Sequence, residues 1–198
     1  KPALRIATSR NDGTNFIGYV ARLFMQAHGI DDATLAAWGG TYVEDTNPRD
    51  SLTRMEAGEV DAVLQEAIMT PWWAHLVESG QVVPLAADAG ALARLRQDHG
   101  FRNNPLPAGY WTPLEKQIDA LDFSDFVVLV RDDMNEDVAH LLTWCLVETR
   151  GAIERQYRHL PPQRSPLSYP LEPAKMATPP IALHAGAQRY YREAGLLA

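Results

Sequence analysis

The stretch Gly58-Glu59-Val60-Asp61-Ala62-Val63-Leu64 decides the fold, because it joins the end of a helix to an apolar strand within seven residues. Gly58 ends a short helix predicted over residues 50–57, and residues 60–65 are predicted as a strand. Outward from it, the pattern predicts strands at residues 4–8, 34–38, 81–85 and 123–130, with helices at 15–28, 71–78, 90–99 and 135–158. Strands that alternate with helices through short links predict an α/β protein whose mainly parallel sheet is covered by helices.

The distribution of these elements predicts two parts. Residues 1–122 hold most of the strands and are predicted to form an α/β ligand-binding lobe. Residues 123–198 hold a strongly apolar strand, a long helix and a C-terminal wrapping segment. Seven prolines between Leu160 and Pro180 exclude a regular helix or a central strand there.

The composition of the chain limits which partners and which chemistry are expected. The chain has 198 residues, 46% hydrophobic and 22% charged, with a net charge of −7. Lys and Arg form no stripe, so nucleic acid is not expected as a partner. Cys145 is the single cysteine; it lies in an apolar helical run and is predicted to be a buried, unreactive thiol. One cysteine fits the cytoplasm and the bacterial periplasm equally, and a start at Lys1 without Met indicates a mature product or a cut segment.

No motif for catalysis is found. The histidines are scattered and none forms a His-Glu-x-x-His pattern. The chain has neither a Gly-x-Ser-x-Gly elbow nor a phosphate-binding loop ending in Gly-Lys-Ser/Thr. We therefore expect no enzyme, no catalytic residue, no cofactor and no metal site.

The first candidate for ligand binding is the loop after the first strand. Ligands of open parallel sheets sit at the carboxyl ends of strands, and a helix N-terminus there suits a carboxylate. Arg10 can add a bidentate pair with an anion. The same polar residues can instead serve only to cap the helix. The loop consists of Ser9, Arg10, Asn11, Asp12, Gly13, Thr14 and Asn15.

Three further segments are expected near the same edge. Gly39, Gly40 and Thr41 follow the predicted second strand, and two glycines let a ligand approach the backbone closely. Glu66 follows the third strand and can bind an ammonium or hydroxyl group. Trp72 and its neighbour open a helix, where consecutive side chains point about 100° apart, so at most one faces a ligand while the other packs. Each segment also has a plain reading, as a turn, a surface carboxylate and a core aromatic.

The chain ends in a motif that suggests a family. Two prolines precede the run His184-Ala185-Gly186-Ala187-Gln188-Arg189-Tyr190-Tyr191-Arg192-Glu193-Ala194-Gly195. This ending resembles that of TAXI-type solute-binding receptors, the extracytoplasmic subunits of some TRAP transporters. The Gly-x-x-Asp-Ala step at residues 58–62 likewise resembles a step in type II periplasmic binding proteins. The resemblance implies a receptor in the periplasm, or otherwise outside the cytoplasm, that passes a small organic anion or amino acid to membrane transporter subunits.

Alternatives remain beside this reading. Members of that family have roughly a hundred more residues at the front, so the chain is either the C-terminal part of a receptor or a compact, complete two-lobed protein. An enzyme of the same fold that handles a small pyrimidine is a second candidate, although such enzymes use cysteines and a lysine that this chain does not offer. A cytoplasmic effector-sensing domain is the third.

Overall fold

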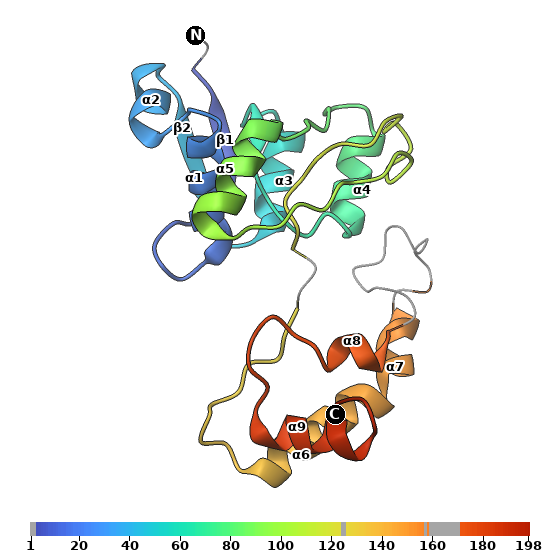
Figure 1. Cartoon of the computed structure of the whole chain (residues 1–198). Coiled ribbons are helices and arrows are strands. Elements are labelled where there is room, and N and C mark those ends of the chain that lie inside the picture. The colour runs from blue at the N-terminus through green and yellow to red at the C-terminus, as the bar shows by residue number, and fades with distance from the viewer. Residues whose placement is uncertain (1–2, 124–125, 157, 159–170) are drawn as a thin grey trace. The chain divides into compact units, whose positions relative to one another are not determined.

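The computed structural model of the chain describes residues 3–123, 126–156, 158 and 171–198. Its residues group into two compact units, residues 1–122 and residues 123–198 (Figure 1). Each unit has its own buried core and is described separately below.

The first unit is built on a small parallel sheet. The strands β1 (Arg5–Ser9), β2 (Thr41–Asp45) and β3 (Ala62–Val63) lie in the order β2-β1-β3, and β1 pairs in parallel with both neighbours. The central strand is buried from Ile6 to Ser9. The predicted α/β class and the parallel sheet are confirmed.

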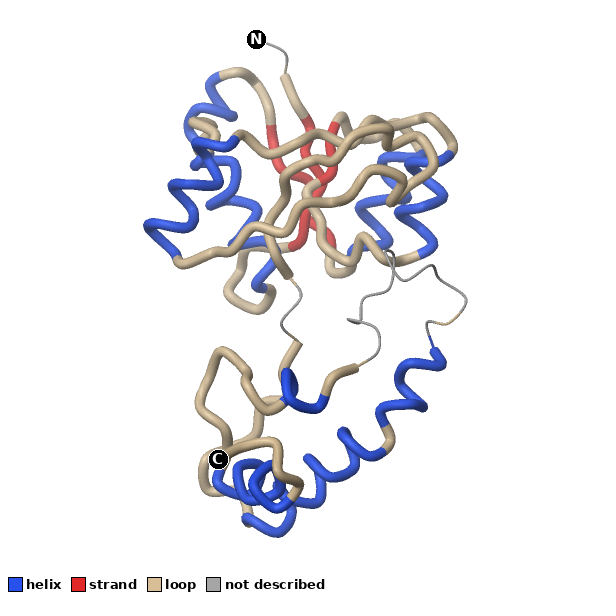
Figure 2. Tube along the Cα trace, turned by 45° about the vertical axis from the view of Figure 1, so that its right-hand side comes forward, coloured by secondary structure: helices blue, strands red, loops and turns tan. Residues whose placement is uncertain are grey.

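Helices cover both faces of this sheet. Helices α1 (Phe16–Ala27) and α5 (Ala89–His99) pack together on one side, and α3 (Pro48–Glu56) and α4 (Pro71–Glu78) on the other (Figures 1 and 2). Helices α1, α3 and α4 each follow a strand. Because the strands are parallel, the N-termini of these three helices lie at the same edge of the sheet.

The starts of these helices agree with the sequence. Asn15 caps α1 by accepting a hydrogen bond from the Ile17 amide at 2.8 Å, and Asn47 caps α3 by accepting one from the Asp50 amide at 3.1 Å. Pro71 begins α4, as predicted, because its fixed φ suits the first turn and no helical bond needs its missing N–H.

Two predicted strands of this unit are wrong. Residues 34–38 belong mostly to helix α2 (Asp32–Ala37), which Asp31 caps, and the second strand comes later, at β2. Alanines at 33, 36 and 37 favour the helix. Residues 81–85 form no strand: Val83 and Leu85 are 79% and 83% exposed, and Pro84 offers no N–H for a ladder.

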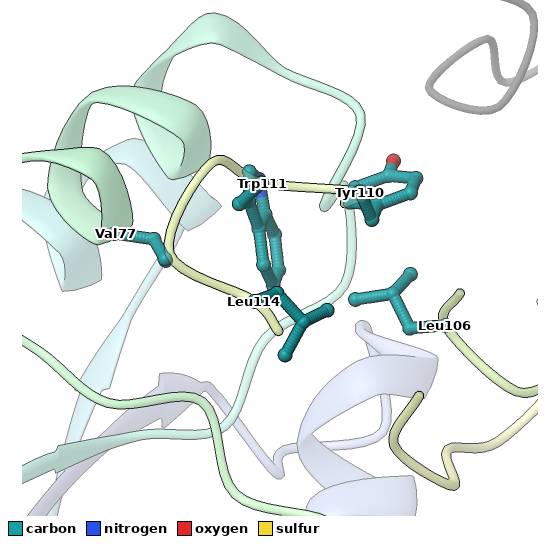
Figure 3. Close-up of a cluster of buried hydrophobic side chains, with 5 residues drawn as sticks. All are labelled: Val77, Leu106, Tyr110, Trp111 and Leu114. Atoms are coloured by element: carbon teal, nitrogen blue, oxygen red, sulfur yellow. The ribbon is translucent and has the colours of Figure 1, made fainter. Parts of the chain in front are cut away.

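A second core in this unit holds α4 in place. Val77 of α4 packs against the segment that follows α5, whose buried members are Leu106, Tyr110, Trp111 and Leu114 (Figure 3). Antiparallel bridges join Asn103 to Leu121 and Leu106 to Ile118 in that segment. The segment therefore fixes the helix that begins at the carboxyl edge of the sheet.

The second unit is helical in its described residues. It contains α6 (Glu136–Glu148), α7 (Arg150–Gln156), α8 (Pro173–Met176) and α9 (Ala185–Glu193). Its core comprises Val147, Ala177, Tyr190 and Tyr191. The predicted helix at 135–158 is thus divided near Thr149. Residues 124–125, 157 and 159–170, which include much of the predicted wrapping segment, lie outside the described residues. The expected absence of a helix between Leu160 and Pro180 does not hold for α8, where Pro173 stands in the first turn, a position that suits proline.

The C-terminal motif is explained by the packing of α9 on α6. Tyr190 is buried and donates a hydrogen bond to Glu148 at 2.8 Å. A Cβ at Gly186 would stand 2.2 Å from the Glu136 carbonyl oxygen, so only glycine allows the two helices to lie this close. His184 caps α9 by accepting a bond from the Gly186 amide at 3.1 Å. Burial also raises the pKa of Tyr190 to about 12, with Glu148 adding to the effect.

Two predictions for this unit are wrong. Residues 126–130 form no strand, and Phe126, Val128 and Leu129 are 71%, 62% and 74% exposed. A strand needs a neighbour for its backbone groups, and among the described residues this segment pairs with none. Cys145 is half-buried rather than buried. No described helix combines the length and the apolar character needed to cross a membrane.

Candidate ligand-binding site

The site is built where the three strands end. β1 ends at Ser9 and β2 at Asp45, which are partners in the ladder, and the chain leaves β3 through Gln65. Parallel strands bring these ends to one border of the sheet, here named the carboxyl edge. Polar residues gather at this edge because backbone and side-chain groups there meet helix N-termini rather than apolar layers.

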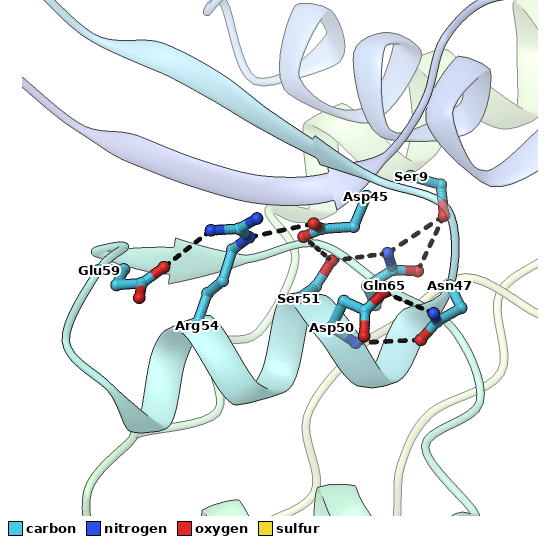
Figure 4. A network of polar contacts seen from close by, with 8 residues as sticks. All are labelled: Ser9, Asp45, Asn47, Asp50, Ser51, Arg54, Glu59 and Gln65. Carbon is cyan, nitrogen blue, oxygen red and sulfur yellow. Dashed lines mark hydrogen bonds and ion pairs between the residues drawn. The ribbon is translucent and has the colours of Figure 1, made fainter.

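A buried polar network joins the three strand ends (Figure 4). Nε2 of Gln65 donates to Ser9 Oγ and to Ser51 Oγ of α3, both at 3.1 Å. Ser51 donates in turn to Asp45 Oδ2 at 3.1 Å. Ser9 and Ser51 are fully buried, and Asp45 is only 6% exposed. Such groups must be bonded to be buried without loss of stability, and these are.

The charge of Asp45 is balanced inside the same network. Nε of Arg54 donates to Asp45 Oδ1 at 3.0 Å, and the other side of the guanidinium meets Glu59 at 2.7 Å. A buried carboxylate without a partner would cost several kcal/mol. The network therefore runs from the solvent-facing Arg54–Glu59 pair to the strand ends.

Two opposite charges follow directly beyond this network. The offset of 56 residues that pairs Ile6 with Ala62 also separates Ser9 from Gln65, whose side chains are bonded. Arg10 and Glu66 are the residues that directly follow Ser9 and Gln65 in the chain. Both residues follow the ends of their strands at the carboxyl edge of the sheet. No ion pair joins either of them to another residue in the described part of the chain.

Glu66 is held in an unusual setting. Its carboxyl group is half-buried, and this loss of water raises its pKa above the ordinary value of 4.5, with a partly opposing bond from the Ala67 amide. Its carbonyl oxygen accepts a bond from Trp73 Nε1 at 2.9 Å. Ala67 has a φ of 61°, which a side chain rarely adopts. A carboxylate kept partly dry and without a cation is suited to a cationic ligand group.

The helix N-termini at this edge differ in their caps. Asn15 and Asn47 already occupy the first turns of α1 and α3. Helix α4 has no side-chain cap, and the hydroxyl oxygen of Thr70, its N-cap residue, is buried without a partner among the described atoms. Of the three helices, α4 thus leaves its first turn most open to an anion.

The predicted loop lies at the carboxyl edge, but much of it bonds to itself. Asp12 accepts bonds from the Thr14 amide, at 3.0 Å, and from its hydroxyl, which together lower the pKa of Asp12. Asn11 and Gly13 are exposed, and Gly13 has a φ of 83°. Ser9 is buried in the network and Asn15 caps α1. The capping interpretation therefore accounts for most of the loop, while Arg10 stays exposed.

Gly39, Gly40 and Thr41 do not lie at this edge. Because α2 replaces the predicted strand, these residues precede β2, and the Thr41 amide bonds to the Leu4 carbonyl at 2.8 Å, where β1 begins. A Cβ at Gly40 would stand 2.7 Å from that carbonyl oxygen. The two glycines therefore permit close packing at the opposite edge, and the predicted grouping with the loop and Glu66 is wrong.

Of the two adjacent tryptophans, one packs in the core and the other is exposed, as expected for consecutive helix positions. Trp73 stacks on Trp111 with ring centroids 6.0 Å apart, whereas Trp72 is 43% exposed at the start of α4. The Arg49 guanidinium lies 5.3 Å from the Trp72 ring centroid. Trp72 is thus the aromatic residue of the pair that a ligand can reach.

Sequence reasoning missed the residues that hold the edge together. Asp45 and Ser51 were missed because the second strand was misplaced, and Gln65 because a lone amide gives no motif. Gly18 was also missed: a Cβ there would stand 2.0 Å from the Arg10 carbonyl oxygen, so α1 packs directly on the loop backbone. The sequence signal that could have found this network is a polar residue at the end of each strand, namely Ser9, Asp45 and Gln65.

Comparison with known proteins gives the family. Among the described residues, no cluster of His, Cys, Asp and Glu could hold a metal ion. No curated protein matches the chain. The sequence matches the NMT1-like family over residues 10–195, nearly its full length. The chain therefore belongs to the NMT1-like family, a periplasmic binding-protein-like family whose fold is that of a solute-binding domain.

Proposed function

We propose that the chain is a solute-binding receptor, or a portion of one, that captures a small amino acid for a membrane transporter. The observation that carries the proposal is the position of Arg10 and Glu66 just beyond the ends of two neighbouring strands. They are opposite charges at adjacent strand ends, and neither is ion-paired in the described chain. An amino acid carries one group for each: its carboxylate suits Arg10 and its ammonium suits Glu66.

The surroundings of the pair support this ligand class. The open first turn of α4, which begins at Pro71 after the turn that follows Glu66, adds partial positive charge for the carboxylate. Trp72 offers an exposed aromatic face for the rest of the solute. An organic anion without an ammonium group would use Arg10 and α4 but would leave Glu66 as a repelling charge.

The wider role rests on the resemblance of the C-terminal motif to TAXI-type receptors of TRAP transporters. This resemblance supports a location in the periplasm, or otherwise outside the cytoplasm, with membrane transporter subunits as partners. We also propose that residues 123–198 belong to a second lobe. The exposed apolar side chains of Phe126, Val128 and Leu129, and of Leu141 and Trp144 on α6, support a further layer over that unit.

A thermal-shift screen tests the ligand class. The twenty L-amino acids are compared with the matching acids that lack the amino group. A ligand that binds only the native state stabilises it by about 2.7 kcal/mol at a hundredfold excess over Kd, and the melting temperature therefore rises with ligand concentration. The proposal expects a shift with one or a few amino acids and none with their deaminated partners. Equal shifts with both would contradict it.

A further inference from the structure

We infer that Gln65 is a positioning residue, whose amide fixes the ends of β1 and β3 against α3 and thereby sets where Glu66 stands relative to Arg10. This inference rests on the proposed function, because it concerns the same pair of charges. Gln65 does not itself face the solute: its side-chain atoms are engaged by Ser9 and Ser51 (Figure 4).

The orientation of the Gln65 amide follows from the carboxylate of Asp45, to which it is linked through Ser51. An ionised Asp45 can only accept hydrogen bonds, so Ser51 must give its one proton to Asp45 Oδ2. The Ser51 oxygen can then only accept, which requires the NH₂ group of Gln65 on its side. The carbonyl oxygen of the amide is left for Ser9, whose hydroxyl lies 3.3 Å from Oε1. The charge of Asp45 thus selects one of the two ways the amide can lie.

The chain is held by hydrogen bonds on both sides of the Glu66 side chain. Before it in the chain, the Gln65 side chain is tied to Ser9 and Ser51. After it, the chain turns at Ala67, and Trp73 Nε1 binds the Glu66 carbonyl oxygen at 2.9 Å. Two fixed points around one residue leave its carboxylate little freedom to move toward water. Gln65 therefore keeps Glu66 half-buried and ready for a cation rather than solvated.

The test is a carboxyl NMR titration of the full chain without solute, so that it does not depend on the ligand proposal. The Glu66 signal is assigned by its loss in Glu66→Gln. Gln65→Met removes the amide and keeps the length of the side chain, and Ser51→Ala is the milder variant if Gln65→Met does not fold. Glu59→Gln is the control, because it changes the network at its solvent end and leaves Asp45, Ser51 and Gln65 with their partners.

The inference expects the Glu66 carboxyl to titrate above its ordinary value in the wild type and in Glu59→Gln. In Gln65→Met, and to a smaller extent in Ser51→Ala, its pKa should fall back toward the ordinary value. A Glu66 titration unchanged in both variants would overturn the positioning role, whatever the stability change. An equal fall in Glu59→Gln would overturn it too, because general loosening would then be the cause. A negative solute screen with the expected titrations would instead count against the proposed function alone.

Discussion

Arg5 holds Asp61 with three hydrogen bonds, at the edge of the sheet opposite the candidate site. Its backbone amide and Nε reach Asp61 Oδ2 at 2.8 and 3.1 Å, and its outer nitrogen reaches Oδ1 at 2.9 Å. The pair ties the start of β1 to the residue before β3. It explains the aspartate in the Gly-x-x-Asp-Ala step as a lock on strand register.

This lock predicts a pH-dependent loss of stability. The bonds from Arg5 lower the pKa of Asp61 to about 2, from an ordinary value of 3.8. A lowered carboxyl pKa stabilises the fold above the unfolded-state pKa, and the contribution is lost as the pH falls toward 2. Asp61→Asn should therefore melt below the wild type at pH 7, and the gap in melting temperature should close between about pH 4 and pH 2. A gap that persists at pH 2 would point to a different cause.

The close approach of α9 to α6 predicts a contrast between two glycines. Gly186→Ala should lose about 1 to 3 kcal/mol of unfolding free energy, because the new Cβ overlaps the Glu136 carbonyl. Gly151→Ala is the matched control: its Cβ would be 3.8 Å from the nearest atom, on a flexible arginine, so helix α7 should gain roughly 0.5 to 1 kcal/mol. Urea unfolding measures both. Similar effects of the two changes would show that α9 does not pack as described.

The half-buried Glu66 predicts a conflict between stability and binding. Its raised pKa means that the folded state disfavours the charge, so stability falls as the pH rises from the ordinary value of 4.5 through the raised pKa. Glu66→Gln should melt at or above the wild-type temperature at pH 7, with the difference gone below pH 4. A melting temperature clearly below the wild type at pH 7 would mean that Glu66 has a stabilising partner.

Because the apolar side chains of residues 126–129 are exposed, we expect this segment to tolerate a charged substitution. Leu129→Asp should change the unfolding free energy of this chain by no more than about 0.5 kcal/mol, since the side chain is 74% exposed. Leu76→Asp, at a fully buried position of α4, serves as the contrast and should prevent stable folding. A loss of several kcal/mol with Leu129→Asp would show that this chain already covers the segment.

Much of the fold could be predicted because its signals are local. Asn15 and Pro71 marked helix starts through groups within a few residues, and the buried run of β1 needed only its own apolar residues. The parallel arrangement followed from the alternation of elements. The resemblance of the C-terminal motif pointed to a binding protein, and the family match agrees at that level.

The failures share a physical cause, which is dependence on distant partners. Residues 34–38 were ambiguous because a short apolar run fits a helix or a strand, and the cap at Asp31 decides for the helix. Because that strand was predicted too early in the chain, Gly39 and Gly40 were predicted at the carboxyl edge instead of the opposite one. The Ser51–Asp45 bond could not be foreseen without the correct strand. Residues 126–130 have strong strand propensity, but propensity supplies no neighbour to pair with.

The central claim is that Arg10 and Glu66 together recognise an amino acid, and isothermal titration with the strongest amino acid from the screen tests it most directly. Removing a charge-assisted hydrogen bond costs about 1.5 to 3 kcal/mol, or roughly 10- to 150-fold in affinity. Arg10→Ala and Glu66→Gln should each weaken the amino acid by that much, and wild-type affinity should fall as the pH drops through the raised pKa of Glu66. Glu66→Gln should also bring the deaminated acid level with the amino acid. Unchanged affinity in both variants, with the wild type still binding, would contradict the account.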